Sequence, residues 1–437
     1  MTNMERTTCL VVGGGPAGMV LGLLMARAGI EVTVLEKHKD FLRDFRGDTV
    51  HTSTQNLIDE LGLGPRFAQV PHRRIETMRM QFDEGAITVA DMRRLPGAHP
   101  YIALVPQWDF LDVLADAAAE EPTFTLRRNA EVIDVVRDGD RVVGVRYRDR
   151  VAGTEHEIRA TLTVACDGRG SAVRAAAGLA PRSFGVPMDV WWFRLSRRDG
   201  DPVGGVGRIS TGQMCVMIDR GDYWQCAYLI RKGSDGELRA AGIEELRRRF
   251  AALLPWMADR MAELESFDQV SLLDVQLNRL RRWDLDGLLL IGDAAHAMSP
   301  VGGVGINLAV ADAVAAARIL APALRSGGIV PRSLLHRVQR RRLLPTAIIQ
   351  GVQRAAHKGL FGQIMRDEPT QLPHTATAAG MADAVIPDAP LESLPLPLRL
   401  LQRFPVLQGL PARLVSIGPL PEHAPEWARR PATPART

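Results

Sequence analysis

Three glycine-rich segments of this chain carry acidic residues where a ligand could bind. They are residues 13–18, with Glu36 eighteen positions after Gly18, residues 167–174, and residues 292–307. Glycine lets the backbone approach a flat ligand, and a helix that begins beside it offers free N–H groups and a positive dipole end. Each segment alone predicts only a strand, a turn and a helix, so its meaning depends on the other two.

The first segment has the pattern G-x-G-x-x-G, formed by Gly13, Gly15 and Gly18. It lies between an apolar run at residues 8–12 and a helical pattern, and a second apolar run ends on Glu36. In such a βαβ unit the glycines allow a tight turn, close approach of a diphosphate and close helix packing, and the acid accepts from ribose hydroxyls. An acid here favours FAD or NAD over NADP.

The other two segments also follow apolar runs. Residues 287–291 predict a buried strand before residues 292–307, and the small residues 308–314 predict a helix after them. Residues 162–166 predict a strand that delivers Asp167-Gly168 and then Ser-x-x-Arg at a helix start. Judged by itself, this last segment would be a β-turn and a capped helix.

Composition limits the function classes. The chain has 437 residues, 46% hydrophobic and 24% charged, which is typical of a globular protein with two or three domain-sized units. A net charge of +4 without a basic block does not indicate nucleic-acid binding. The four cysteines form no C-x-x-C pair, which argues against a zinc site and a redox disulfide, so we expect no metal. We identified neither a signal peptide nor an apolar run long enough for a membrane span, and expect a cytoplasmic protein without membrane contact.

The middle of the chain differs from its flanks. Residues 189–195, 213–218 and 223–230 predict antiparallel strands, followed by helical patterns, and four of the seven tryptophans lie in this part. It is a separate unit inserted before the chain returns at Leu288. Helices are expected to about Lys358, and a proline- and leucine-rich tail follows from residue 387.

Together the three glycine-rich segments, in this order and at these separations, resemble the FAD-dependent aromatic hydroxylases, the single-component flavoprotein monooxygenases typified by para-hydroxybenzoate hydroxylase. The resemblance covers about residues 8–345 and implies an α/β fold: a Rossmann-like FAD-binding domain, an inserted antiparallel-sheet substrate domain and C-terminal helices. We expect the FAD-binding domain at 1–75, 97–180 and 285–345, the substrate-binding domain at 76–96 and 181–284, and a helical segment and tail at 346–437.

The resemblance also implies roles for individual residues. Pro300 would pack beside the isoalloxazine, and we assign Pro300 and Gly303 to the catalytic position. Asp293 would bond the ribityl or diphosphate part, Asp167 belongs to a motif linked to FAD and NAD(P)H, and Arg46 could clamp the diphosphate, although a solvated arginine is equally expected. The full set expected to bind the cofactor is Gly13, Gly15, Pro16, Ala17, Gly18, Glu36, Lys37, Arg46, Gln107, Asp167, Asp293, Pro300, Gly303, Val304, Gly305, Ile306 and Asn307.

The implied reaction is the hydroxylation of an aromatic or polycyclic small molecule. NADPH or NADH would reduce the FAD, O₂ would add to give a flavin C(4a)-hydroperoxide, and one oxygen would pass to the substrate. The helix after Gly305 would stabilise negative charge on the reduced flavin.

Substrate contacts are less defined. Gln225 interrupts a mostly apolar strand face, although an amide satisfied by a neighbouring backbone group would explain it better. Trp192, Gln213 and Met217 are further candidates that core packing explains better, and Met298 is another candidate. The chain has four tyrosines, and we cannot place the tyrosine pair that deprotonates hydroxybenzoate in the family's type member. His51 and His72 are expected to be solvated, and His296 to be structural.

Alternative functions remain open at this point. A flavin-dependent halogenase of the same fold carries a Trp-x-Trp-x-Ile-Pro signature, which residues 191–194 do not match. A flavin-dependent reductase is possible because flavin motifs do not report oxygen use. A non-catalytic flavin- or ligand-binding protein is also possible, since all the motifs serve binding.

Overall fold

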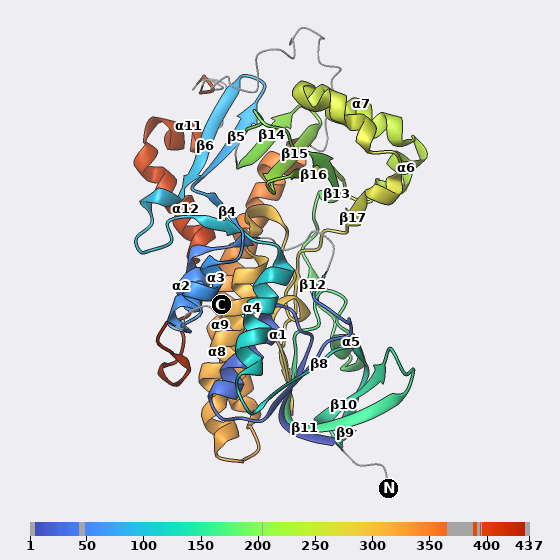
Figure 1. The fold of residues 1–437 in the computed structure, drawn as a ribbon, viewed down its shortest axis with the longest axis vertical. Coiled ribbons are helices and arrows are strands. Elements are labelled where there is room, and N and C mark those ends of the chain that lie inside the picture. Colours follow the sequence, from blue (N-terminus) through green and yellow to red (C-terminus); the bar gives the residue numbers. More distant parts are fainter. Residues whose placement is uncertain are drawn as a thin grey trace.

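The computed structural model describes residues 5–42, 49–202, 204–364, 388–390, 394 and 396–432. They form two stacked parts joined along two long helices (Figure 1). One part contains a mainly parallel sheet with helices, and the other contains a second sheet with small helices at its outer face.

The first sheet has eight strands in the described residues, with the parallel path β20-β11-β1-β2-β8 at its centre. The last four residues of β1 and all of β2 are buried, as expected for a parallel sheet covered on both faces, which explains the apolar runs there. The hairpin β9–β10 extends the sheet from β11, and β19 pairs with β20. Its strands are β1 (Glu5–Val12), β2 (Val32–Leu35), β8 (Phe124–Arg127), β9 (Ala130–Asp138), β10 (Arg141–Asp149), β11 (Glu155–Ala165), β19 (Asp284–Leu285) and β20 (Leu288–Leu290).

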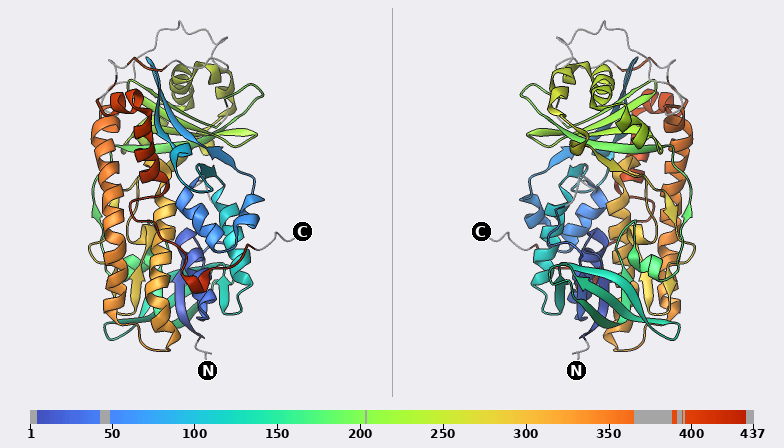
Figure 2. Two further views of the ribbon diagram at one scale, coloured as in Figure 1. Left: turned by 90° about the vertical axis from the view of Figure 1, so that its left-hand side faces the viewer. Right: turned by 90° about the vertical axis from the view of Figure 1, so that its right-hand side faces the viewer.

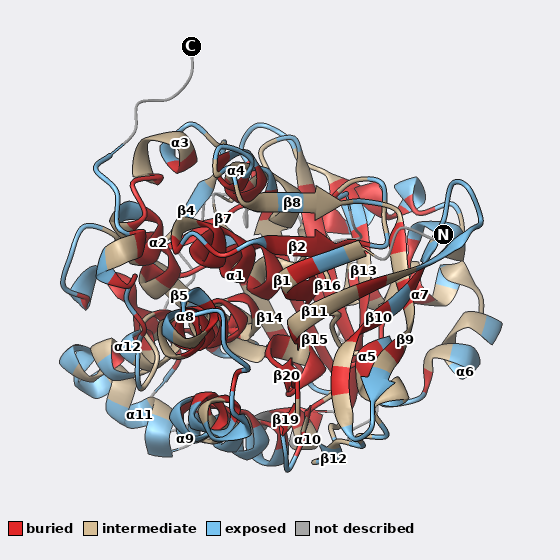
Figure 3. Cartoon of the chain, turned by 90° about the horizontal axis from the view of Figure 1, so that it is seen from below, coloured by how far each residue is buried: buried red, intermediate tan, exposed pale blue. Residues whose placement is uncertain are grey.

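Helices pack beside this sheet and bury its core (Figure 3). The helix α1 (Pro16–Arg27) is buried along ten of its twelve residues and contacts both α8 and α4. The long helices α8 and α9 lie side by side (Figure 2). The helices of this part are α2 (Thr52–Glu60), α3 (Gly64–Ala68), α4 (Gln107–Ala119), α5 (Ala172–Ala176), α8 (Gly305–Arg325) and α9 (Arg332–Ala356).

The second sheet has the order β17-β13-β16-β15-β14-β5-β6. Its strands are β5 (Thr77–Phe82), β6 (Gly85–Asp91), β13 (Met188–Ser196), β14 (Gly205–Ser210), β15 (Gln213–Asp219), β16 (Tyr223–Arg231) and β17 (Ser271–Leu273). Because β5 pairs with β14, the early hairpin and the later inserted strands form one sheet. Small helices, α6 (Asp235–Ala240) and α7 (Ile243–Leu253), cover its outer side.

The two faces of this second sheet have different partners. On the helix-side face, Trp191, Phe193, Trp224 and Tyr228 pack with Phe250 of α7 and its neighbours. On the loop-side face, alternate residues of the same strands pack with Val301 and Phe361, which lie outside the sheet.

Smaller elements connect the two parts. The strands β3 (Thr49–Val50), β7 (Ile102–Leu104) and β4 (Arg73–Ile75) form one small sheet, and β12 (Arg182–Ser183) pairs with β18 (Asn278–Arg279). A π-helical turn, His357–Phe361, follows α9 and leads into α10 (Gly362–Ile364). The C-terminal helices α11 (Leu396–Arg403) and α12 (Gly409–Ser416) return to pack beside β6.

The α/β architecture expected from the sequence is confirmed, with two differences of detail. The helix α9 runs to Ala356, close to the expected end at Lys358, so the expected domain boundary at residue 345 falls inside this helix, at Pro345. The segment Val301–Arg325 is long and apolar enough to cross a membrane by composition, which corrects our reading of the sequence, but most of it is buried inside the protein. Its burial is that of a core helix.

Candidate flavin site

The three glycine-rich segments meet at the carboxyl ends of β1, β11 and β20. A Cβ added to Gly13 would lie 2.6 Å from the carbonyl oxygen of Cys166, and one added to Gly292 would lie 3.4 Å from the Cβ of Ala17. Arg169 and Asp293 form an ion pair with 3.1 Å between Nε and Oδ2. Segments more than a hundred residues apart therefore form one continuous edge, where ligands bind in open α/β sheets.

Two kinds of glycine stand at the start of α1. Gly13 has φ of 101°, and a Cβ on Gly18 would lie 1.9 Å from the carbonyl oxygen of Gly13, so protein packing itself requires both. A Cβ on Gly15 would meet no protein atom within 4 Å, and the same is true of Gly305 at the start of α8. The space beside these two helix starts fits the diphosphate and ring of a dinucleotide. Pro16 and Ala17 form the first turn of α1.

The carboxylate of Glu36 is aimed back at this loop. Its Oε2 accepts from the backbone N–H of Gly14 at 2.8 Å, and its Oε1 accepts from that of His38 at 3.0 Å. The side chain is buried, and each oxygen has a second lone pair. The Glu36 carboxylate is therefore fixed beside the α1 N-terminus.

Asp167 organises the second segment from inside. Its carboxylate accepts from the hydroxyl of Ser171 at 2.5 Å and from the N–H of Val173 at 3.1 Å, at the start of α5. Burial raises the pKa of Asp167, against the opposing effect of these bonds. Arg174 donates to the carbonyl oxygen of Ala294 at 3.0 Å. The second segment thus positions the third.

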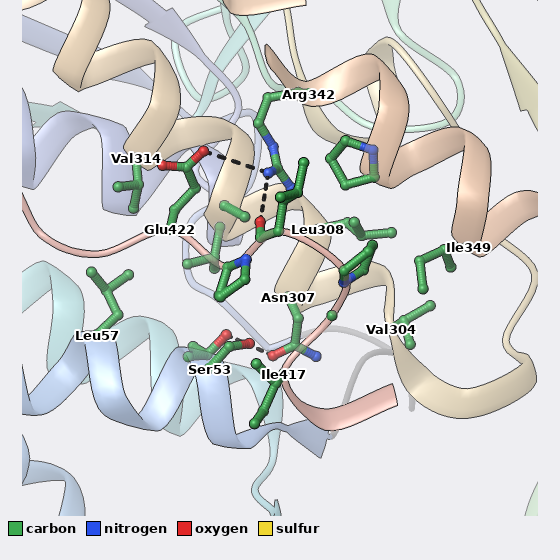
Figure 4. A pocket seen from close by; sticks show the side chains of 18 of the residues that line it. Ser53, Leu57, Val304, Asn307, Leu308, Val314, Arg342, Ile349, Ile417 and Glu422 are labelled. Atoms are coloured by element: carbon green, nitrogen blue, oxygen red, sulfur yellow. Dashed lines mark hydrogen bonds and ion pairs between the residues drawn. The ribbon is translucent and has the colours of Figure 1, made fainter. Parts of the chain in front are cut away.

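A buried ionic network fixes the third segment to α8. Asp312 accepts from the N–H of Gly292 at 3.1 Å, faces Nε2 of His296 at 2.6 Å and pairs with Arg342 at 2.9 Å. Arg342 also faces Glu422 of the C-terminal segment at 3.5 Å (Figure 4). His296 has the structural role expected from the sequence.

The loop around Pro300 is clamped by the end of α9. The amide of Gln353 donates to the carbonyl oxygens of Ser299 and Val301, both at 2.9 Å. His357 contacts the hydroxyl of Ser299 through Nε2 at 2.9 Å, and burial lowers the pKa of His357. These bonds hold Pro300 at the border between the two parts of the molecule.

Residues 49–54 clamp the other end of this loop. Thr49 donates to the carbonyl oxygen of Gly303 at 3.0 Å, and Asn307 accepts from the hydroxyl of Thr54 at 2.6 Å and from the N–H of His51 at 3.2 Å. Nδ2 of Asn307 is buried and has no hydrogen-bond partner within the described part of the chain. Figure 4 shows Asn307 in a pocket between α2, α8 and the C-terminal segment, with Ser53 and Ile417 beside it.

His51 is buried and not solvated, which corrects our expectation. Its Nδ1 lies 2.8 Å from the carbonyl oxygen of Val415 in α12, so Nδ1 carries the proton and Nε2 is an acceptor. Nε2 has no partner among the described residues and lies beside Gly303, whose added Cβ would be 3.4 Å away. Burial lowers the pKa of His51 to about 4, so the ring is neutral at pH 7. His72, also expected to be solvated, is partly buried and stacks on Phe67.

Four other residues predicted to bind the cofactor lie at the start of a helix or shortly after a strand. Gln107 is the first residue of α4 and Lys37 is exposed after β2. Val304 and Ile306 are buried around the start of α8. Arg46 lies outside the described residues.

The predicted substrate residues divide between the two sheet faces. Trp192 and Gln225 lie on the loop-side face, where Trp192 Nε1 and Gln225 Nε2 are buried without partners among the residues that the structure describes. Gln213 and Met217 lie on the helix-side face: Met217 is in its core, and Gln213 accepts from the hydroxyl of Tyr228 at 3.0 Å. Strand alternation turns these two toward α7, which favours the core-packing explanation, and their role as substrate contacts stays a prediction.

Met298 also lies inside the protein, and its role as a substrate contact stays a prediction. It is buried in a cluster with Leu277, Val304 and Ile349, so its side chain is packed by the chain itself. Sequence reasoning also missed Gln353 and His357. Gln353 lies near the end of α9, and His357 follows four residues later at the start of the π-helical turn, a spacing that places two side chains on one helical face.

Comparison with known proteins agrees with this geometry. Residues 6–352 match the family model described as "FAD binding domain". The chain is 35% identical to 6-methylpretetramide 4-monooxygenase of Streptomyces rimosus over 77% of this chain and 80% of that protein. It is 28% identical to para-nitrophenol 4-monooxygenase of a Pseudomonas species, over 73% and 78% of the two chains.

A solved structure has the same fold. The anhydrotetracycline hydroxylase OxyS from Streptomyces rimosus superposes with a TM-score of 0.69 and 24% identity, covering 94% of this chain and 76% of that one. The matched family covers all three glycine-rich segments and the inserted sheet. This chain belongs to the FAD-dependent aromatic hydroxylases.

Proposed function

We propose that this FAD-dependent monooxygenase hydroxylates a polycyclic aromatic molecule held between the Pro300 loop and the loop-side face of the second sheet. The observation that carries the proposal is the packing of Val301, next to Pro300, against that face. The loop that borders the flavin in our assignment therefore borders the inserted sheet as well. The relative named for 6-methylpretetramide suggests the size of the substrate.

The first part of the chain would hold the cofactor. In this proposal the FAD diphosphate lies at the N-terminus of α1 beside Gly15, the adenosine ribose at Glu36, and the ring at Gly303–Asn307. Residues 1–75, 97–180 and 285–345 form the FAD-binding domain, and residues 76–96 and 181–284 the substrate-binding domain. The union of β5–β6 with the inserted strands supports this division.

The bound flavin supplies the redox chemistry, with NAD(P)H as reductant and O₂ as oxidant. The residues of this chain orient the reactants and exclude water. The positive end of α8 stabilises negative charge next to Gly305, and Asn307 Nδ2 offers a buried donor there. His51 keeps Nε2 unprotonated beside Gly303, so it presents an acceptor and not a second positive charge.

Two donors on the loop-side face would orient the substrate. Trp192 Nε1 and Gln225 Nε2 lack protein acceptors, and leaving a buried donor without a partner is costly. A phenol or quinone oxygen of the substrate would satisfy them. This favours a substrate rich in oxygen over a plain hydrocarbon ring.

The test is oxygen incorporation. We expect 6-methylpretetramide, or another polycyclic phenol, to accelerate NAD(P)H oxidation by the purified FAD-bound protein at least tenfold. The product should contain one oxygen atom from ¹⁸O₂, measured by mass spectrometry. If no polycyclic or simple phenol accelerates NAD(P)H oxidation, the proposed reaction is wrong.

A further inference from the structure

Three arginines from separate elements surround one aromatic ring on the side of the molecule. The guanidinium carbons of Arg182 and Arg279 are both 5.5 Å from the ring centre of Phe184, and that of Arg354 is 5.1 Å away. Arg182 lies on β12, Arg279 is its register partner on β18, and Arg354 lies near the end of α9. Three positive charges therefore lie around the same aromatic ring.

The chain supplies no negative charge to this cluster among the residues that the structure describes. No ion pair with a carboxylate forms at any of the three, and Arg279 donates to the neutral amide of Gln350 at 3.1 Å. Burial lowers the pKa of Arg279, and the charges of Arg182 and Arg354 lower it further. Like charges that lie close together without a counter-charge repel one another, which costs free energy. A bound anion would offset this cost.

The cluster is connected to the Pro300 loop by adjacent residues. Asn278, next to Arg279, exchanges hydrogen bonds with Ala297 in both directions at 3.2 Å. Gln353, next to Arg354, bonds Ser299 and Val301. Phe184 itself packs in the cluster that contains Met298 and Val304. An anion at the arginines would therefore lie close to the loop that borders the flavin.

We propose that Arg182, Arg279 and Arg354 form a docking site for the phosphate groups of the nicotinamide reductant. The inference rests on the proposed function, in which NAD(P)H must approach the flavin, and adds where its phosphates bind. Guanidinium groups bind phosphate in bidentate geometry, and three of them match a diphosphate or a 2′-phosphate. Two of the three, Arg182 and Arg354, are exposed, so the site is accessible to a ligand that leaves after each turnover.

The test compares Arg182→Gln, Arg354→Gln and their double variant with a control on the same helix, Arg337→Gln. Arg337 is also exposed and lies seventeen residues before Arg354, about 25 Å along the helix. Anaerobic reduction of bound FAD by NADH and by NADPH, followed by flavin absorbance, gives the apparent Kd of each reductant. Arg182, Arg354 and Arg337 are all exposed, so each variant should still fold.

We expect each single variant to raise the apparent Kd of the reductant about tenfold and the double variant about a hundredfold, the range for charge-assisted hydrogen bonds. The limiting rate of reduction, the FAD content and the substrate KM should stay within twofold, as should every value for Arg337→Gln. A loss confined to NADPH assigns the 2′-phosphate, and an equal loss for NADH assigns the diphosphate. Unchanged Kd values, or a change only in substrate KM, would overturn the site.

Inorganic pyrophosphate provides a second readout that does not depend on flavin reduction. Isothermal titration should show that pyrophosphate binds to the wild type and to Arg337→Gln. Its affinity for the double variant should be at least tenfold lower. If the wild type is not reduced by NAD(P)H, the proposed function fails, and the pyrophosphate titration still decides whether the cluster is an anion site. Equal pyrophosphate binding by all variants would exclude it.

Discussion

Two buried glutamines on neighbouring strands of the second sheet have opposite surroundings. Gln213 on β15 is 2% exposed and accepts from the hydroxyl of Tyr228 on the helix-side face. Gln225 on β16 is 1% exposed, accepts from Arg220 at 2.8 Å, and leaves its Nε2 without a partner on the loop-side face. One amide is used by the fold, and the other is available to a ligand. The same sheet thus has a face for stability and a face for binding.

The largest effect is expected from the core of the helix-side face. Phe250 of α7 is fully buried and meets Phe193 at 5.2 Å between ring centres and Tyr228 at 6.1 Å. We expect Phe250→Ala to lower the free energy of unfolding by about 3–5 kcal/mol, because it removes apolar contacts and leaves a cavity. Denaturant unfolding followed by the fluorescence of the neighbouring tryptophans would measure it. A loss below about 1 kcal/mol would mean that this face does not carry the stability of the sheet.

A buried ion pair on the same side should make stability depend on pH. Burial alone raises the pKa of Asp201, but hydrogen bonds from Arg260, from the backbone of Arg198 and from Trp224 outweigh burial and lower it to about 2. Because the folded pKa lies below the ordinary value, the stabilisation is complete above about pH 4 and is lost as pH falls toward 2. The pH-dependent part amounts to roughly 2 kcal/mol.

Asp201→Asn should remove this pH dependence. The stability difference between wild type and variant, measured by denaturant unfolding, should be largest at neutral pH and shrink between about pH 4 and 2. A difference that stays constant over this range would show that Asp201 is not held in its charged form by Arg260. The side chains of both residues are 5% exposed, so solvent screening is weak.

The fold and the cofactor edge could be predicted from the sequence because their signals are local. Gly13 and Gly18 are required by contacts inside one strand–turn–helix unit, so their spacing alone indicates the structure. Residues 292–307 are likewise bounded by an apolar run and a small-residue helix. The comparisons with known proteins confirmed the family that these three segments indicated.

The two faces of the second sheet could not be assigned in the same way, because their packing partners lie far away in the sequence. Alternation shows that Gln225 interrupts an apolar strand face, but which face of the sheet meets α7 depends on how the whole insert packs. His51 was misjudged for the same reason, since its partner Val415 comes more than three hundred residues later. Long-range contacts of this kind leave no trace in local spacing.

The smallest effect, and the most direct test of the two faces, comes from one substitution made at both glutamines. Gln225→Glu keeps an oxygen for Arg220 and replaces the unpartnered donor with an acceptor, which would repel a substrate oxygen. We expect the substrate KM to rise about tenfold, equal to about 1.4 kcal/mol, with little change in unfolding free energy. The readout is NAD(P)H oxidation titrated with the substrate that shows ¹⁸O incorporation.

Gln213→Glu is the matched control on the other face. It places a carboxylate in the helix-side core, where burying a charge is costly, so the unfolding free energy should fall while the substrate KM of the folded fraction stays within twofold. If the two variants exchange these effects, the assignment of the faces is reversed. If Gln225→Glu changes neither KM nor stability, its free amide does not contact the substrate, and Trp192 Nε1 becomes the remaining donor on the loop-side face.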